Sequence, residues 1–257
     1  MDAAAARGRA VGSGSVSLLT FHGIAKRFGG VVALAGVDGA VEQGEIVGLV
    51  GPNGSGKSTL INVLSGHYRT DVGRVFVDGS EVTNRQAHEI VRAGIARTYQ
   101  IPRAFAGMST AQNVAVPLMF GRRGLRSDEA MVEARRSLVL VGLAGHADEP
   151  IGRLNLHQLK YLELARALAT EPKVLFLDEV LAGLNPREIE ESIELIRGVH
   201  GRGITLVIVE HVLRVVTTVT TRLMVLHQGR LIADGRPRDV MNEPEVKRAY
   251  LGGHDAD

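Results

Sequence analysis

Residues 51–58 combine glycines, a lysine and a serine in a spacing that can bind nucleotide phosphates. The segment fits the pattern G-x-x-x-x-G-K-[ST] and reads Gly51, Pro52, Asn53, Gly54, Ser55, Gly56, Lys57 and Ser58, followed by Thr59. Glycines allow backbone N–H groups to surround an anion, and the N-terminus of a following helix adds positive potential. Lys57 supplies charge for the β- and γ-phosphates, and the Ser58 hydroxyl can ligate Mg²⁺. The alternative interpretation is a glycine-rich turn between a strand and a helix that holds a lysine by chance.

Two adjacent carboxylates follow a second apolar run. Val-Leu-Phe-Leu at residues 174–177 leads directly into Asp178 and Glu179. A strand that ends beside the phosphate-binding segment would let Asp178 hold Mg²⁺, directly or through a water. Glu179 can orient or deprotonate an attacking water. A strand end capped by exposed acids is the alternative, but the two motifs together predict nucleotide binding with chemistry at the γ-phosphate.

Short apolar runs stand in front of these polar segments and predict the elements that position them. Such runs are typical of strands in a buried parallel sheet, and they occupy residues 45–50, 174–177 and 205–209. Peripheral strands are expected at residues 16–21 and 74–77, and a hairpin at 222–227 and 230–233. Helical spacing is found at residues 59–64, 126–141, 155–169 and 236–251. The sequence therefore predicts an α/β core with a helical insertion at about residues 101–165.

Composition excludes several classes of protein. The 257 residues contain no cysteine, so a disulfide framework, a thiolate nucleophile and a Cys-ligated metal site are excluded. With 30 basic and 28 acidic residues the net charge is +2, which argues against a nucleic-acid binder. The longest charge-free run, residues 104–121, is too polar to span a membrane. Residues 1–16 lack the apolar segment of a signal peptide and are expected to form a disordered tail, so membrane association would come through a partner.

Further landmarks fall in the order found in ABC-type ATPase domains. They are residues 94–105, 154–168, 178–185 and the pair Glu210-His211. From about residue 18 to 252 the chain resembles the ATP-binding subunits of branched-chain amino-acid importers, with similar stretches at residues 26–34, 182–186 and 243–252. The resemblance implies a RecA-like P-loop NTPase core at residues 17–100 and 166–235, with an antiparallel β subdomain. It also implies a helical insertion subdomain at about 101–165 and a C-terminal helical appendage at 236–257, all within one ABC ATPase domain, 17–257.

The same resemblance assigns roles to three further residues, with ATP and Mg²⁺ as cofactors. Gln100 would sense the γ-phosphate and Mg²⁺ and couple to a membrane partner, and it joins Ser58 and Asp178 as a metal ligand. His211 would contact the γ-phosphate and help arrange the water near Glu179. Phe28 would stack on adenine. The ordinary alternatives are a surface amide, one of nine histidines, and a core residue at a strand edge.

The segment that departs most from the family is the signature, which usually reads Leu-Ser-Gly-Gly-Gln. Here it is Leu154, Asn155, Leu156, His157 and Gln158. In the family this segment covers the γ-phosphate that the opposite subunit holds. The Asn155 amide can replace the usual serine hydroxyl as a donor, whereas His157 puts a ring where glycine permits close backbone approach. We hypothesise that the composite site built on Asn155 and His157 is slow; the alternative is that the imidazole itself donates to the phosphate.

The function expected from the resemblance is MgATP hydrolysis that powers uptake of branched-chain or other hydrophobic amino acids. The chain would lie peripherally at the cytoplasmic face of the cell membrane, bound to transmembrane permease subunits. A second ATPase subunit would complete the sites, as a heterodimer in preference to a homodimer, and a substrate-binding protein would act indirectly. Two alternatives remain open: a weakly hydrolysing, nucleotide-binding regulatory subunit, and a soluble ABC ATPase that acts in translation or DNA repair. The latter class usually has two ATPase halves or a long coiled coil.

Overall fold

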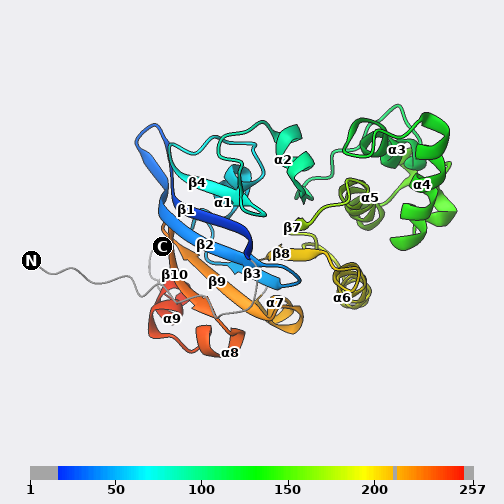
Figure 1. Ribbon diagram of the computed structural model, residues 1–257. Helices are drawn as coiled ribbons and strands as arrows, with labels where there is room; N and C mark the ends of the chain where they lie inside the picture. Colours follow the sequence, from blue (N-terminus) through cyan, green and yellow to red (C-terminus); the bar gives the residue numbers. More distant parts are fainter. Residues whose placement is uncertain (1–16, 211–212, 252–257) are drawn as a thin grey trace, which may run out of the picture.

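A six-stranded sheet forms the centre of the computed structural model, which describes residues 17–210 and 213–251 (Figure 1). The strand order is β10-β9-β3-β8-β7-β6, and every neighbouring pair except the β9/β10 hairpin is parallel. The strands are β3 (Ile46–Val50), β6 (Ile95–Arg97), β7 (Val174–Asp178), β8 (Thr205–Val209), β9 (Arg222–His227) and β10 (Arg230–Gly235). Every residue of β3, β7 and β8 is buried, as expected for parallel strands covered on both faces. The predicted parallel strands are therefore confirmed.

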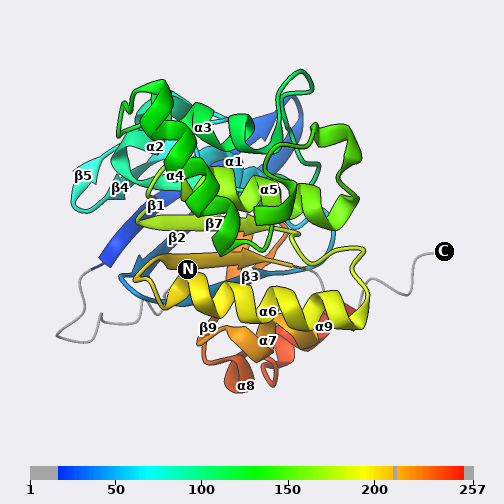
Figure 2. The ribbon, with the colours of Figure 1, turned by 90° about the vertical axis from the view of Figure 1, so that its right-hand side faces the viewer.

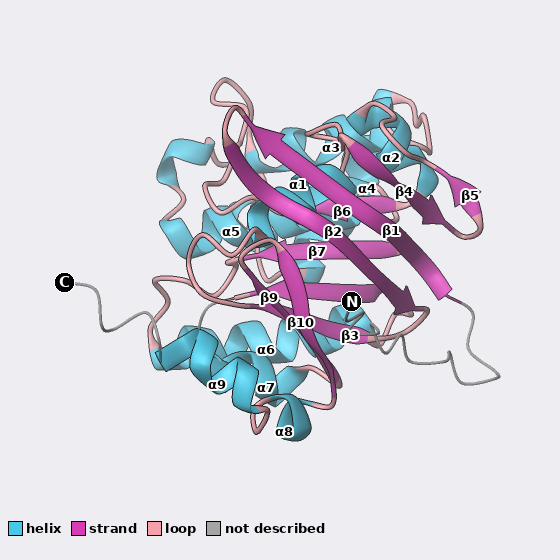
Figure 3. Cartoon of the chain, turned by 90° about the vertical axis from the view of Figure 1, so that its left-hand side faces the viewer, coloured by secondary structure: helices cyan, strands magenta, loops and turns pink. Residues whose placement is uncertain are grey.

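A smaller antiparallel sheet lies across one face of the central sheet (Figure 3). Its order is β2-β1-β4-β5, formed by β1 (Ser17–Phe28), β2 (Val31–Glu42), β4 (Val72–Val77) and β5 (Ser80–Glu81). Its inner face shares one hydrophobic cluster with the central sheet, which includes Phe21, Leu34 and Phe176. Strand β2 was not predicted from the sequence. Gly39 of this strand packs on the Phe21 ring, where a Cβ would collide with it, so the fit requires a residue that weakens the strand pattern.

Three longer helices lie between β6 and β7 in the chain and stand to one side of the sheets (Figure 1). They are α3 (Thr110–Phe120), α4 (Ser127–Leu140) and α5 (Leu156–Leu168), with short 3₁₀ turns η1 (Ala144–His146) and η2 (Ile151–Arg153) before α5. Their shared cluster includes Val114, Leu138 and Leu162 and continues onto Leu175 of β7. The expected division at residue 165 falls inside α5, so this helix belongs to both parts.

The remaining helices cover the two faces of the central sheet (Figure 2). They are α1 (Lys57–Leu64), α2 (Ala87–Ala93), α6 (Pro186–His200), α7 (Leu213–Val219), α8 (Pro237–Val240) and α9 (Pro244–Leu251). Along β3, Val47 and Leu49 face the cluster that contains α1, whereas Val50 faces the cluster of α7, α8 and α9. Within the described residues, no helix has the length and apolar character that a membrane span requires.

Candidate functional site

The phosphate-binding segment connects the end of β3 to the start of α1 through a tight loop. Gly51, Gly54 and Gly56 have φ angles of 149°, 75° and 108°, in the region that favours glycine. A Cβ on Gly51 would collide with the carbonyl oxygen of Leu226, and one on Gly56 would lie 2.6 Å from the carbonyl oxygen of Ala33. The loop therefore packs closely against the backbone of Leu226 and Ala33, and only glycine fits at Gly51 and Gly56.

The polar groups of this loop are arranged to receive an anion. Lys57 is only 8% exposed, and its Nζ donates to the carbonyl oxygens of Gly51 at 2.8 Å and Pro52 at 2.9 Å. The Ser55 hydroxyl is buried and has no hydrogen-bond partner among the described residues. The first backbone hydrogen bond of α1 runs from the Leu60 N–H to the Gly56 carbonyl oxygen. The N–H groups of residues 56–59 therefore stand outside the helical hydrogen-bond ladder and can meet phosphate oxygens.

Asp178 and Glu179 lie close enough to this loop to influence Lys57. Burial lowers the pKa of the Lys57 ammonium, and the charges of Glu179 and Asp178 oppose that shift. Burial raises the pKa of the Asp178 carboxyl, and the positive charge of Arg97 works in the opposite direction. The structure thus brings together, at the ends of β3 and β7, the cation and carboxylates that the sequence placed about 120 residues apart.

Gln100 and Glu179 meet directly. The Gln100 Nε2 donates to Glu179 Oε2 at 2.5 Å. Glu179 has a φ of 48°, an uncommon backbone conformation for a residue with a side chain. Its N–H is nevertheless fixed by a 2.9 Å bond to the carbonyl oxygen of Val209 at the end of β8. His211 follows one residue after Glu210 and lies outside the described residues.

Arg97 is a site residue that the sequence analysis did not single out. From β6 its guanidinium donates to Asp178 Oδ2 at 2.8 Å and to Asn62 Oδ1 of α1 at 2.5 Å, and it stacks 4.6 Å from the Tyr99 ring centroid. Both side chains of the ion pair are only 9% exposed. The guanidinium therefore ties the end of β7 to the helix that begins at the phosphate loop. Because Arg97 and Asp178 are 81 positions apart, no local spacing indicated their contact.

Phe28, at the end of β1, is an exposed aromatic residue. Its side chain is 44% exposed, which contradicts the alternative of a core residue at a strand edge. The Tyr68 ring packs edge-on against it with centroids 5.3 Å apart, and Lys26 Nζ lies 5.5 Å from its centroid. The ring is thus held by two neighbours while the residue stays partly exposed to solvent.

The signature segment forms the N-terminus of α5. Asn155 caps the helix: its Oδ1 accepts from the Gln158 N–H at 2.8 Å, and Gln158 Oε1 accepts from the Asn155 N–H at 2.9 Å. With its oxygen so engaged, Asn155 keeps its Nδ2 amide as the donor for an outside group. Leu156, the next residue, is 55% exposed.

His157 does not share this outward environment. Its ring packs edge-on against Tyr161 with centroids 4.2 Å apart, and its Nδ1 lies 3.8 Å from Glu188 Oε1 at the start of α6. Its Nε2 is buried without a hydrogen-bond partner among the described residues. The imidazole therefore fills space between α5 and α6 of its own chain, an orientation that a sequence pattern does not indicate.

The C-terminal helix α9 reaches back to the phosphate loop. Burial raises the pKa of the Tyr250 hydroxyl to about 12, against a smaller, opposite influence of the Gly51 backbone N–H. The hydroxyl is buried and faces that N–H outside ordinary hydrogen-bond geometry. Helix α9 thus lies close to the first residue of the loop through Tyr250.

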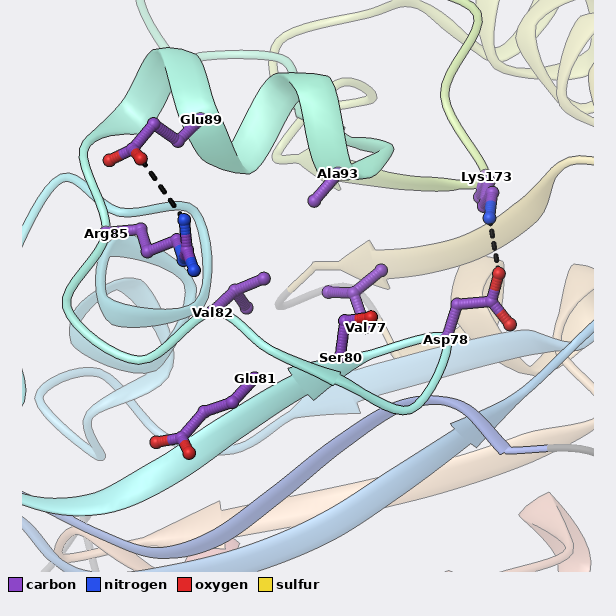
Figure 4. Close-up of a pocket in the computed structure, with 9 residues that line it drawn as sticks. All are labelled: Val77, Asp78, Ser80, Glu81, Val82, Arg85, Glu89, Ala93 and Lys173. Atoms are coloured by element: carbon purple, nitrogen blue, oxygen red, sulfur yellow. Dashed lines mark hydrogen bonds and ion pairs between the residues drawn. The ribbon is translucent and has the colours of Figure 1, made fainter.

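A separate pocket of about 340 Å³ lies beside β4, β5 and α2 (Figure 4). Its charged groups already have partners, because Lys173 pairs with Asp78 at 2.5 Å and Arg85 pairs with Glu89 at 3.3 Å. No residue predicted from the sequence as functional lines it. The pocket therefore contributes nothing to the site around Lys57.

Comparison with known proteins places the chain among transport ATPases. It matches the sequence profile described as "ABC transporter" over residues 34–182, and that of the "Branched-chain amino acid ATP-binding cassette transporter" over residues 230–256. A protein of Archaeoglobus fulgidus, the probable branched-chain amino acid transport ATP-binding protein LivG, is 38% identical, covering 94% of this chain and 98% of its own length. The high-affinity branched-chain amino acid transport ATP-binding protein BraF of Pseudomonas aeruginosa is 35% identical, covering 91% and 98%.

Solved structures agree with these relatives. A crystal structure of the ADP conformation of an ATP-binding cassette of an ABC transporter superposes with a TM-score of 0.83 at 33% identity, covering 93% of this chain and 100% of that chain. A dimeric post-hydrolysis structure of another ATP-binding cassette, bound to ADP and Pi, gives a TM-score of 0.78 at 25% identity, covering 86% and 99%. The predicted RecA-like fold is confirmed by these likenesses.

Proposed function

This chain belongs to the ABC transporter family, whose ATP-binding subunits couple ATP hydrolysis to transport, and we propose that it drives uptake of branched-chain or other hydrophobic amino acids. The observation that carries the proposal is the convergence of Lys57, Asp178, Glu179 and Gln100 at one edge of the sheet. The cargo is inferred from the relatives named for branched-chain amino acids, and from the profile matched by residues 230–256.

The phosphate loop would bind the triphosphate of ATP. The Lys57 ammonium would exchange its two carbonyl acceptors for β- and γ-phosphate oxygens. The negative charge of the phosphates would favour the protonated lysine and oppose the burial that lowers its pKa. The Ser55 hydroxyl, buried without a partner among the described residues, would donate to the same phosphates. Phe28 would stack on the adenine ring.

The oxygen atoms of Ser58, Gln100 and Asp178 form a donor set suited to Mg²⁺. Arg97 engages Oδ2 of Asp178, which leaves Oδ1 as the oxygen that can face a metal. When bound, Mg²⁺ would neutralise charge on the β- and γ-phosphates. Arg97 would keep the carboxylate of Asp178 ionised and correctly turned.

Glu179 would act on the water that attacks the γ-phosphate. Its Oε2 accepts from Gln100, so a displacement of Gln100 by a membrane partner would change the orientation of the carboxylate. This contact gives a physical route from permease to hydrolysis. His211 would assist at the γ-phosphate.

The site would be completed by a second ATPase subunit, in a heterodimer. Asn155 would direct its Nδ2 amide to the γ-phosphate that the partner holds, because its Oδ1 is occupied as a helix cap. His157 would act in packing between α5 and α6 rather than at the phosphate. Transmembrane permeases would hold the dimer at the cytoplasmic face of the cell membrane, and a substrate-binding protein would deliver the amino acid.

Uptake by whole cells tests this function. Removal of this chain should abolish uptake of radiolabelled leucine and leave uptake of lysine unchanged, and the restored wild-type chain should recover it. A Lys57→Ala chain should not recover uptake, whereas a Lys247→Ala chain, altered in α9 near Asn242, should do so. Unchanged leucine uptake after removal would exclude the proposed cargo and favour another role for the ATPase.

A further inference from the structure

The buried ammonium group of Lys160 contacts the segment that begins at Glu179. Lys160, on α5, is only 6% exposed. Its Nζ donates to the carbonyl oxygens of Val180 at 3.2 Å and Glu179 at 3.4 Å, and also to that of Ala182. Burial of a lysine ammonium costs free energy unless its charge is compensated. The three backbone carbonyls of this one short segment supply that compensation.

Glu210 also forms a hydrogen bond with this segment. This carboxylate, which directly follows β8, is buried and accepts from the Leu181 N–H at 2.8 Å. Burial lowers the pKa of Lys160, and the negative charges of Glu210, Glu179 and Glu188 oppose that shift. Lys160 and Glu210 therefore hold carbonyl and amide groups of residues 179–182 between opposite charges.

The segment so held contains the unusual backbone of Glu179. Its φ of 48° is an unfavourable conformation for a residue with a side chain, and it persists only where the surroundings impose it. The Glu179 N–H is bonded to Val209, and the Glu179 carbonyl accepts from both the Ala182 N–H at 3.2 Å and the Lys160 ammonium. Lys160 thus acts on the peptide group that leads away from the strained residue.

We propose that Lys160 is a positioning residue for hydrolysis, which fixes the backbone of residues 179–182 so that the Glu179 carboxylate faces Gln100 and the nucleotide. The inference rests on the proposed function, in which Glu179 acts on the water. Lys160 also lies on the helix that Asn155 caps. Helix α5 therefore carries both Asn155, proposed to contact the partner's nucleotide, and Lys160, proposed to position Glu179. A movement of α5 would change both sites together.

Lys160→Met tests the positioning role of Lys160, because methionine keeps an unbranched side chain but removes the hydrogen-bond donor. Lys160→Arg keeps the charge, and Lys160→Gln is a second neutral variant in case the first does not fold. Lys173→Met is the matched control, since Lys173 is exposed and forms an ion pair with Asp78 at the surface pocket. ATP affinity and backbone amide hydrogen exchange are measured on the purified full chain, and KM and kcat on the same chain assembled with its partner ATPase subunit.

We expect Lys160→Met to bind MgATP like the wild type, with unchanged KM and a kcat lowered about 10- to 100-fold, the scale of a misplaced catalytic group. In a Glu179→Gln background it should cause no further loss, because both changes remove the same contribution. Amide exchange at residues 181 and 182, measured without nucleotide, should accelerate at least tenfold. Lys160→Arg should recover part of kcat, and Lys173→Met should match the wild type in all respects.

Unchanged amide exchange at residues 181 and 182 in Lys160→Met and Lys160→Gln would overturn the proposal that Lys160 fixes the backbone of residues 179–182. A lower melting temperature with unchanged kcat would overturn the positioning role and leave Lys160 as a packing residue. If Glu179→Gln hydrolyses ATP as fast as the wild type, the proposed role of Glu179 fails instead. The exchange measurement still judges Lys160 in that case, because it needs no hydrolysis.

Discussion

Replacing Arg97 with methionine should destabilise the fold in a pH-dependent manner. The substitution leaves Asp178 without its ion pair in a setting where both side chains are only 9% exposed. Breaking a buried ion pair by removing one partner costs about 3–5 kcal/mol. We expect about 3 kcal/mol at pH 7, at the lower end of that range because the site is not completely closed to water. For a chain of this size, the melting temperature should fall by about 6–12 °C.

The sign of the pH dependence follows from the shifted pKa of Asp178. Burial raises this pKa in the folded state above its unfolded value, so the folded chain binds the proton more tightly and becomes less stable as pH rises through that pKa. Arg97 lowers the pKa, so its removal raises it further and widens the pH range over which the ionised carboxylate is penalised. The loss of stability should therefore be larger at about pH 7 than at about pH 5.

Urea unfolding followed by circular dichroism at both pH values measures the effect. Arg187→Met is the control: Arg187 forms an exposed ion pair with Glu191 at 3.0 Å, and such pairs contribute about 0–1 kcal/mol. The double variant Arg97→Met/Asp178→Asn should recover at least half of the loss, since it removes the unpaired charge. A loss below about 1 kcal/mol, or one that is equal at both pH values, would refute the reasoning.

Two further predictions concern the phosphate loop and the signature. Lys57→Ala should reduce MgATP affinity at least about tenfold in calorimetry, because charge-assisted hydrogen bonds to phosphate are lost; equal affinity would contradict nucleotide binding by this loop. The double variant Asn155→Ser/His157→Gly should lower the melting temperature without raising ATP turnover between pH 6 and 8, because His157 packs against Tyr161 rather than facing outward. A clear gain in turnover with a partner subunit would show instead that the native signature is degenerate.

The sequence predicted best those features whose cause is local. The strands β3, β7 and β8 consist mainly of consecutive apolar residues, and the phosphate loop needs its glycines within eight consecutive positions. Strand β2 was missed because Gly36 and Gly39 interrupt its pattern, although Gly39 is required against Phe21.

Contacts that depend on tertiary packing were not predictable in this way. The partners of Arg97 and Lys160 lie about 20 to 80 positions away in the sequence. The direction of the His157 ring depends on how α5 packs against α6. The sequence predicted the groups that we propose to contact the nucleotide, whereas the groups that hold them in place emerged only from the fold.

ATP hydrolysis by the Glu179→Gln variant is the most direct test of the site. The substitution keeps the size of the side chain and removes the carboxylate that would act on water. We predict that the variant binds MgATP with near wild-type affinity while phosphate release falls at least about 100-fold, the usual scale of acid–base contributions. Phosphate release at the wild-type rate would contradict the assignment of Glu179 and with it the proposed arrangement of Lys57, Asp178 and Gln100 around the γ-phosphate.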